Sequence, residues 1–227
     1  MNATSAVNVV NMIELKNIYK AYPSKGIHKQ IFQGLNFEFS SDRNYALLGS
    51  NGVGKSTLLR LIAGAESPDH GKVIRKGKVS WPMGFSGGFN GSMTGIESLK
   101  FVARIYGKDP HAIIDSVNEF SELGNSMKLP IKTYSSGMRA RLAFGLSLAI
   151  DFDCYLVDEV IAVGDSSFRK KSKKAFREKF DKSFLIMASH SEGLLKDYCD
   201  CGLLLDDNGV HFYDTIESML EAYQKNK

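Results

Sequence analysis

The feature that most constrains this chain is a glycine-rich segment between a short apolar run and a leucine-rich stretch. The segment reads Gly49-Ser50-Asn51-Gly52-Val53-Gly54-Lys55-Ser56 and fits the phosphate-binding pattern G-x-x-x-x-G-K-[ST]. The apolar run at 45–48 is typical of a buried strand, and residues 58–62 are typical of a helix that ends at Gly64. A strand, a loop and a helix in this order predict an α/β fold with a parallel sheet.

The residues of this segment suit the binding of a nucleotide phosphate. The glycines allow successive backbone N–H groups to face one phosphate, and the following helix directs its positive N-terminus at the same charge. We expect Lys55 to reach the β- and γ-phosphates, and the Ser56 hydroxyl to ligate Mg²⁺. The predicted nucleotide-binding residues of this loop are Gly49, Ser50, Asn51, Gly52, Val53, Gly54, Lys55, Ser56 and Thr57.

Two carboxylates follow a second apolar run. Residues 154–157 predict a buried strand, which delivers Asp158 and Glu159 to the carboxyl edge of the sheet, where α/β proteins bind ligands. We expect Asp158 to hold Mg²⁺ through water, and Glu159 to orient and deprotonate an attacking water molecule. Strands often end in acidic residues, so this interpretation depends on the phosphate loop.

A serine–glycine segment precedes the third predicted helix, which spans residues 136–149. The segment contains Ser135, Ser136 and Gly137. On its own it is equally well explained as a helix cap, with Ser135 or Ser136 as the N-cap.

The rest of the chain indicates one domain with a subdomain. Residues 12–19 and 31–39 alternate between apolar and polar side chains and predict a small N-terminal antiparallel sheet. Thr94 and Glu97 form a capping-box pattern, and Asp109 precedes a proline, so two helices are expected in the middle of the chain. We assign 10–92 and 151–227 to a β-rich core part and 93–150 to an inserted helical subdomain.

Composition excludes several classes of protein. No segment reaches the run of about 20 mostly apolar residues that a transmembrane helix needs, and the N-terminus does not resemble a signal peptide. The three cysteines fit no zinc pattern and indicate a reducing compartment. The net charge is +4, with eight basic and two acidic residues at 168–182. We interpret that segment as a solvated helix face with Phe168, Ala175, Phe176 and Phe180 inside, and attraction to an anionic membrane is the alternative.

The phosphate loop, the serine–glycine helix start, the Asp158–Glu159 strand end and His190 after a later strand occur in the order seen in ATP-binding-cassette ATPases. The chain resembles that family over essentially its whole length. The resemblance implies an ATPase that uses ATP and Mg²⁺ and works as a homodimer. In this family the serine–glycine motif, here Ser135, Ser136 and Gly137, binds the γ-phosphate held by the other subunit.

The same resemblance implies three further roles. Asp165 matches the aspartate of the loop that crosses the dimer, and His190 matches the histidine that contacts the γ-phosphate. Tyr22 resembles the aromatic residue that stacks on adenine, although Tyr19 or Phe32 could take that role.

One departure from the family pattern indicates a subgroup. The family places a glutamine in the loop before the helical region, whereas this chain has Trp81 and Met83 in the segment 79–89 and no glutamine there. Together with residues 133–139 and 157–165, this resembles the ATPase subunits of capsular-polysaccharide exporters of the polysialic-acid type. The resemblance implies an integral-membrane permease partner and a peripheral position on the cytoplasmic face of the inner membrane. Exporters of O-antigen or teichoic-acid polymers are the nearest alternative.

Two other classes of protein fit the sequence less well. A soluble ATPase of this family in DNA repair or translation would usually carry long insertions or two fused cassettes, which this chain does not have. A non-catalytic regulator would be expected to lose Lys55, Glu159 or His190, and all three are present. We therefore expect ATP hydrolysis coupled to transport, without direct contact with nucleic acid.

Overall fold

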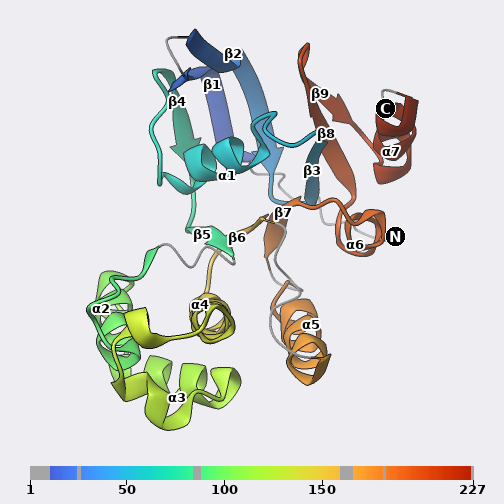
Figure 1. Ribbon diagram of the computed structural model, residues 1–227. Coiled ribbons are helices and arrows are strands. Elements are labelled where there is room, and N and C mark those ends of the chain that lie inside the picture. The colour runs from blue at the N-terminus through green and yellow to red at the C-terminus, as the bar shows by residue number, and fades with distance from the viewer. Residues whose placement is uncertain (1–10, 25–26, 84–87, 159–165, 181–182, 226–227) are drawn as a thin grey trace, which may run out of the picture. The chain divides into compact units, whose positions relative to one another are not determined.

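The computed structural model describes residues 11–24, 27–83, 88–158, 166–180 and 183–225 (Figure 1). They belong to two compact units. The first unit comprises residues 1–79, 153–156 and 183–227, and the second comprises residues 80–152 and 157–182. Within the described part of the chain, no helix is long and apolar enough to cross a membrane.

The first unit begins with an antiparallel sheet in the order β2-β1-β4. Leu15 lies opposite Phe37 on one side and Val73 on the other. The alternate residues Ile13 and Leu15 are buried, because side chains of one parity along a strand point to the same face. The predicted antiparallel strands are confirmed, both longer than expected, and a third strand joins them. These strands are β1 (Asn11–Ser24), β2 (Ile27–Ser40) and β4 (His70–Arg75).

A second, mainly parallel sheet forms the centre of the same unit. Its strands there run in the order β6-β7-β3-β8-β9, with β3 parallel to both β7 and β8, and β8 antiparallel to β9. β3 and β7 are buried along their whole length, which explains their continuous apolar sequences. The strands are β3 (Tyr45–Gly49), β6 (Cys154–Asp158), β7 (Phe184–Ala188), β8 (Cys201–Asp206) and β9 (Gly209–Tyr213).

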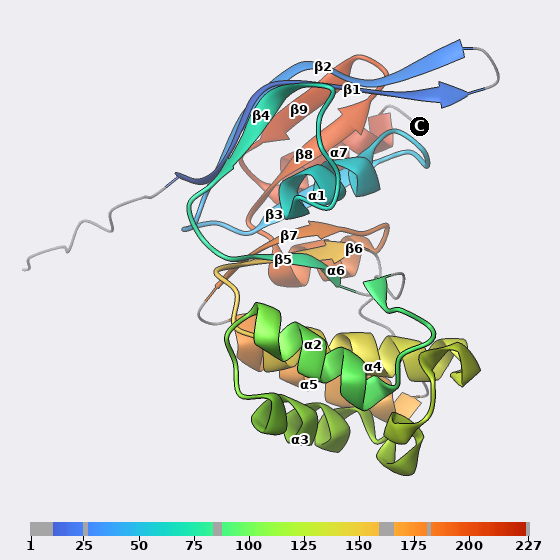
Figure 2. The same ribbon diagram turned by 90° about the vertical axis from the view of Figure 1, so that its left-hand side faces the viewer.

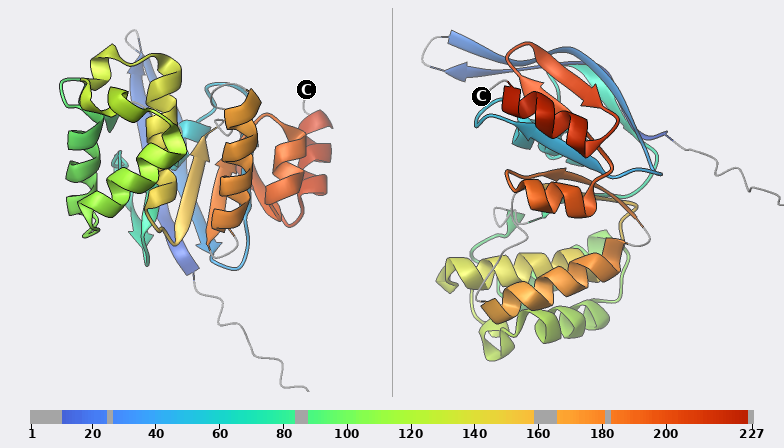
Figure 3. Two further views of the ribbon diagram at one scale, coloured as in Figure 1. Left: turned by 90° about the horizontal axis from the view of Figure 1, so that it is seen from below. Right: turned by 90° about the vertical axis from the view of Figure 1, so that its right-hand side faces the viewer.

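Three helices complete the first unit as far as its residues are described. Helix α1 (Lys55–Ala63) lies beneath the sheet of β1, β2 and β4 (Figure 2), and its leucines share one apolar core with both sheets. α1 stops at Gly64, as predicted: Ala63 is its last residue, and Gly64 is its C-cap in the left-handed conformation. Helix α7 (Ile216–Lys225), red in Figure 3, packs on β8 and β9 and beside α6 (Glu192–Tyr198).

The second unit is mostly helical. α3 packs against α2 and α4, and α4 packs against α5. Thr94 forms the predicted capping box with Glu97, and Asp109 caps the next helix through the backbone N–H of His111. The elements are α2 (Gly95–Ile105), α3 (Pro110–Ser121), η2 (Gly124–Lys128), η3 (Ile131–Thr133), α4 (Ser136–Ala149) and α5 (Ser166–Phe180).

The basic segment forms helix α5 and has the predicted orientation. Phe168, Phe176 and Phe180 are buried and Ala175 is half-buried, whereas most of the basic side chains are exposed. Basic residues of the helix form ion pairs within the unit: Lys171 binds Glu122 and Lys179 binds Asp151, each at 2.6 Å, and Lys174 lies 3.9 Å from Glu178. The expected solvated helix face is therefore confirmed for the described residues.

The predicted loop at 79–89 is partly a strand. β5 (Val79–Met83) occupies its first half, and residues 84–87 lie outside the described part. Trp81 donates a hydrogen bond from Nε1 to Ser147 Oγ at 3.0 Å, and its ring meets Tyr106 and Phe152 edge-on. Trp81 therefore holds the strand against the helices of the same unit.

Candidate functional site

The phosphate-loop residues lie between the end of β3 and the start of α1, as predicted. Two glycines are required by close contacts in this loop. A Cβ atom at Gly49 would lie 2.3 Å from the backbone oxygen of Leu205. At Gly54 the backbone has φ 123°, and a Cβ atom would lie 2.6 Å from Ile31 Cγ2. A side chain at Gly49 would displace the backbone of the neighbouring strand, and one at Gly54 would strain the backbone and push the Ile31 side chain aside, so the tight curl of the loop depends on both glycines.

Lys55 begins α1 and is 8% exposed. Its ammonium group curls back into the loop and donates hydrogen bonds to the carbonyl oxygens of Gly49 at 2.7 Å and Ser50 at 3.0 Å. The first N–H groups of α1 lack intrahelical acceptors, as at every helix start. A buried cation and the positive end of a helix thus lie together, which is the electrostatic arrangement that attracts a phosphate group.

The other residues of the loop differ in exposure. Ser50, Asn51 and Gly52 are exposed, Val53 and Ser56 are half-buried, and Thr57 is buried. Lys29 of β2 donates a hydrogen bond to the Gly52 carbonyl oxygen at 3.0 Å, which connects the loop to the antiparallel sheet.

His190 lies beside this loop. It follows β7 and is exposed, and its Nε2 lies 3.1 Å from Asn51 Oδ1. The structure therefore brings His190 next to the phosphate loop across 139 residues of sequence.

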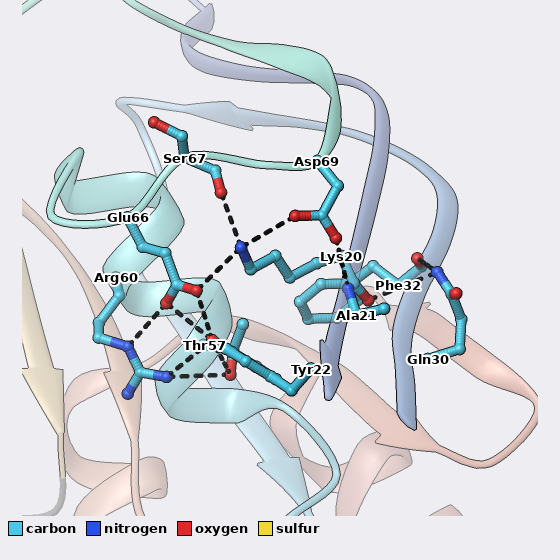
Figure 4. A network of polar contacts seen from close by, with 10 residues as sticks. All are labelled: Lys20, Ala21, Tyr22, Gln30, Phe32, Thr57, Arg60, Glu66, Ser67 and Asp69. Atoms are coloured by element: carbon cyan, nitrogen blue, oxygen red, sulfur yellow. Dashed lines mark hydrogen bonds and ion pairs between the residues drawn. The ribbon is translucent and has the colours of Figure 1, made fainter. Parts of the chain in front are cut away.

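Tyr22 lies over α1, with its hydroxyl group in a network of polar contacts (Figure 4). The hydroxyl donates to the carboxylate of Glu66 at 2.6 Å and accepts from Arg60 at 3.1 Å. It also lies 3.5 Å from Thr57 Oγ1 of the phosphate loop. Sequence reasoning did not identify Glu66 or Arg60, because neither forms a local motif with Tyr22.

Burial and hydrogen bonding shift the pKa of Glu66 in opposite directions. Burial alone would raise the pKa of this carboxyl group, but hydrogen bonds from Tyr22, Arg60 and Lys20 lower it overall. Glu66 is therefore a carboxylate at neutral pH and holds its donors firmly.

The serine–glycine motif lies at the start of α4 in the second unit. Ser135 is the N-cap of this helix, and its Oγ accepts a hydrogen bond from the Met138 backbone N–H at 3.2 Å. Ser135 and Ser136 are exposed, and Gly137 is half-buried. The helix start is thus an exposed, positively polarised surface, as both a cap and an anion-binding motif require.

The remaining predicted site residues lie at the edge of the described part of the chain or outside it. Asp158 is the last residue of β6 and is half-buried. Glu159 and Asp165 lie outside the described residues, so their roles stay predictions.

Comparison with known proteins gives consistent matches. The family described as "ABC transporter" matches residues 32–162. A polysialic acid transport ATP-binding protein, KpsT of Escherichia coli, is 50% identical over 218 residues, which cover 95% of this chain and 100% of that protein. The capsule polysaccharide export ATP-binding protein CtrD of Neisseria meningitidis serogroup B is 43% identical, over 93% of this chain and 98% of its own.

Solved structures support the same fold. The ATP-binding cassette MJ0796, in a dimeric post-hydrolysis state bound to ADP and Pi, is similar with a TM-score of 0.74. The match covers 90% of this chain and 99% of that one at 18% identity. At that identity the likeness concerns the fold, and it confirms the predicted α/β architecture.

Proposed function

This chain belongs to the ABC transporter family, and from that premise we propose that it energises the export of a cell-surface polysaccharide, in particular a capsule. It is an ABC-type ATPase. The observation that carries the proposal is the 43–50% identity, over more than nine-tenths of the chain, to ATP-binding proteins of polysialic acid and capsule export. The buried Lys55 in its glycine loop supports the catalytic part.

In this proposal the loop from Gly49 to Thr57 holds the triphosphate of ATP. The backbone N–H groups and Lys55 bind the β- and γ-phosphates, so the ammonium group exchanges its present carbonyl acceptors for phosphate oxygens. We assign the Ser56 hydroxyl and the Asp158 carboxylate to a magnesium ion by their chemistry, because both groups are oxygen ligands of the type that Mg²⁺ prefers and both residues are half-buried. A bound ion would neutralise charge that develops on the phosphate oxygens.

In this proposal, hydrolysis uses a general base and a side chain that contacts the γ-phosphate. Glu159 accepts a proton from the attacking water, the water oxygen bonds to the γ-phosphorus, and ADP leaves with the bridging oxygen. His190 contacts the γ-phosphate. The hydrogen bond to Asn51 supports this role, because it places the imidazole beside the exposed part of the loop.

Each active site is completed by a second copy of the chain. Ser135, Ser136 and Gly137 of one copy contact the γ-phosphate bound by the other, and Asp165 lies in the loop that crosses the dimer. The exposed N-terminus of α4 supports this arrangement, because such a helix start attracts anions. ATP binds the closed pair better than the open pair, and this difference in affinity drives closure.

The proposal also includes a permease and a location. The helical part, assigned to residues 93–150, transmits closure to an integral-membrane permease at the cytoplasmic face of the inner membrane. The chain stays peripheral and does not contact the polymer.

A Glu159→Gln variant tests the catalytic part of the proposal. Loss of the base should lower phosphate release from MgATP by roughly 10²–10⁴-fold while ATP binding persists. Sedimentation of this variant with MgATP should show a dimer. Glu178→Gln, which alters an exposed glutamate of α5, is the matched control and should retain activity. Near-normal hydrolysis by Glu159→Gln, or a monomer throughout, would contradict the proposal.

Export is tested in the bacterium that encodes the chain. Replacement of the wild-type gene by the Glu159→Gln allele should leave polysaccharide inside the cell and remove it from the surface. Undiminished surface polysaccharide would refute the transport assignment while leaving the ATPase assignment intact.

A further inference from the structure

The Tyr22 side chain is held at its hydroxyl end. Both carboxylate oxygens of Glu66 lie within 2.7 Å of the hydroxyl, and Arg60 Nη2 donates to it at 3.1 Å. A hydrogen bond to a charged partner is shorter and stronger than one between neutral groups. The aromatic ring, whose torsions are otherwise restricted only by packing, is therefore fixed by three polar contacts (Figure 4).

Glu66 is itself held from two sides. Arg60 Nε donates to its carboxylate at 3.0 Å, and Lys20 forms an ion pair with it at 3.0 Å. The carboxylate is partly buried, with 20% of the side chain exposed, so these contacts are screened less than surface ion pairs. Glu66 cannot turn away from Tyr22 without breaking contacts with two cations.

The same network attaches the end of β1 to the loop after α1. Lys20 Nζ also donates to the Ser67 carbonyl oxygen at 3.0 Å and pairs with Asp69 at 3.1 Å. The Asp69 carboxylate accepts from the Ala21 backbone N–H at 2.7 Å. The backbone on the N-terminal side of Tyr22 is thus fixed, as is the tip of its side chain.

The faces of the Tyr22 ring are not equivalent. The Lys20 ammonium lies over one face, 5.4 Å from the ring centroid. A planar base that stacks on this residue therefore uses the opposite face.

We infer that Glu66, supported by Arg60, is a positioning residue that fixes the Tyr22 ring as a preformed platform for the adenine of ATP. This inference rests on the proposed function. It adds a specific claim: Glu66 contacts no reacting atom, and acts by removing the cost of ordering the ring when nucleotide binds. Loss of Glu66 should weaken the binding of the base and leave the binding of the triphosphate unchanged.

The test compares Glu66→Ala and Tyr22→Phe with the wild-type chain. The second variant keeps the ring and removes only the hydroxyl, so it leaves the Glu66–Arg60 pair in place. KM for MgATP should rise about tenfold in Glu66→Ala and several-fold in Tyr22→Phe, with kcat within about twofold of wild type. The inhibition constant of magnesium tripolyphosphate, which has no adenine, should be unchanged in both.

Glu14→Ala is the matched control. Glu14 lies on β1, the strand that carries Tyr22. Like Glu66 it pairs with two cations, here Lys16 and Lys76, but neither pair involves Tyr22. Its KM for MgATP should equal that of the wild type. The KM of the double variant Glu66→Ala/Tyr22→Phe for MgATP should be no higher than that of Glu66→Ala alone, because both changes remove the same contact.

Three results would overturn the inference. The first is an unchanged KM for MgATP in both Glu66→Ala and Tyr22→Phe. The second is a loss of affinity for tripolyphosphate in these variants as large as their loss of affinity for MgATP. The third is a rise of KM in the Glu14→Ala control as large as that in Glu66→Ala. Any of these, with an active wild-type enzyme, would leave the proposed function intact. A wild-type chain that does not bind MgATP would refute both.

Discussion

Ser135 has two roles in this account, and a single substitution separates them. As the N-cap of α4, its Oγ satisfies the Met138 backbone N–H. Thr94 makes the equivalent contact with the Glu97 backbone N–H at 3.1 Å, in the same helical unit. Ser135→Ala and Thr94→Ala therefore remove caps of the same kind, but only Ser135 is proposed to contact a nucleotide.

The expected loss of stability is similar for both variants. Replacing a serine or threonine N-cap with alanine costs about 1 kcal/mol, which lowers the melting temperature by about 2–4 °C in a chain of this size. Both variants should therefore remain folded at 25 °C, since natural domains are stable by about 5–15 kcal/mol. Thermal unfolding, monitored by circular dichroism, measures the loss of stability in each variant.

Activity should differ between the two variants. Ser135→Ala removes a hydrogen bond to a charged phosphate, worth about 1.5–3 kcal/mol, and should lower phosphate release by about 10–100-fold. Thr94→Ala should hydrolyse MgATP at close to the wild-type rate. If Ser135→Ala is as active as Thr94→Ala, Ser135 is only a helix cap and the proposed contact across the dimer is wrong.

Three further predictions follow from packing and ionisation. Gly49→Ala should destabilise the fold by about 1–3 kcal/mol in urea denaturation, because its Cβ would overlap the Leu205 carbonyl oxygen; an unchanged midpoint would contradict this close contact. Hydrogen bonds from two lysines lower the pKa of Glu14 to about 2, so its stabilising effect is complete above about pH 4.5 and is lost as the pH falls toward 2. The melting temperature of Glu14→Gln should accordingly be below that of the wild type at pH 7 and converge with it in acid; a constant difference would refute the assignment. The three cysteines should resist alkylation in the folded chain, since burial raises the pKa of each thiol, that of Cys201 to about 11; rapid labelling seen by mass spectrometry would contradict their burial.

Local signals in the sequence predicted much of the fold. The bounds of α4 agree with the prediction of 136–149, because Ser135 provides a recognisable cap and the apolar residues after it are continuous. The glycine loop was likewise placed correctly between its strand and helix. These features depend on residues within one or two turns of each other, which is the range over which patterns in a single sequence are informative.

Three elements were not predicted, and the first of them depends on pairing with a distant strand. β4 has exposed or half-buried residues throughout, without clear alternation, and becomes a strand because it pairs with β1. Helix α6 has only seven residues, too few for a periodic pattern. Helix α7 buries Ile216, Met219 and Leu220, and it is not among the predicted helices.

The candidate site likewise combines a contiguous motif with contacts between residues that are distant in sequence. Lys55 and its loop form a contiguous motif, whereas Tyr22 and Glu66 are separated by 44 residues and His190 and Asn51 by 139. Such contacts arise only when β1, α1 and β7 assemble around one core. No local pattern predicts these contacts: the family resemblance indicated His190, and nothing in the sequence indicated Glu66.

The central claim is that the buried ammonium of Lys55 and the surrounding loop bind the triphosphate that the enzyme hydrolyses. The most direct measurement is phosphate release from MgATP by the wild-type chain and by Lys55→Met, which keeps an unbranched side chain, one heavy atom shorter, and removes its charge. We predict release by the wild type and a loss of at least about 10²-fold in the variant. An inactive wild type, or a variant as active as the wild type, would contradict the account.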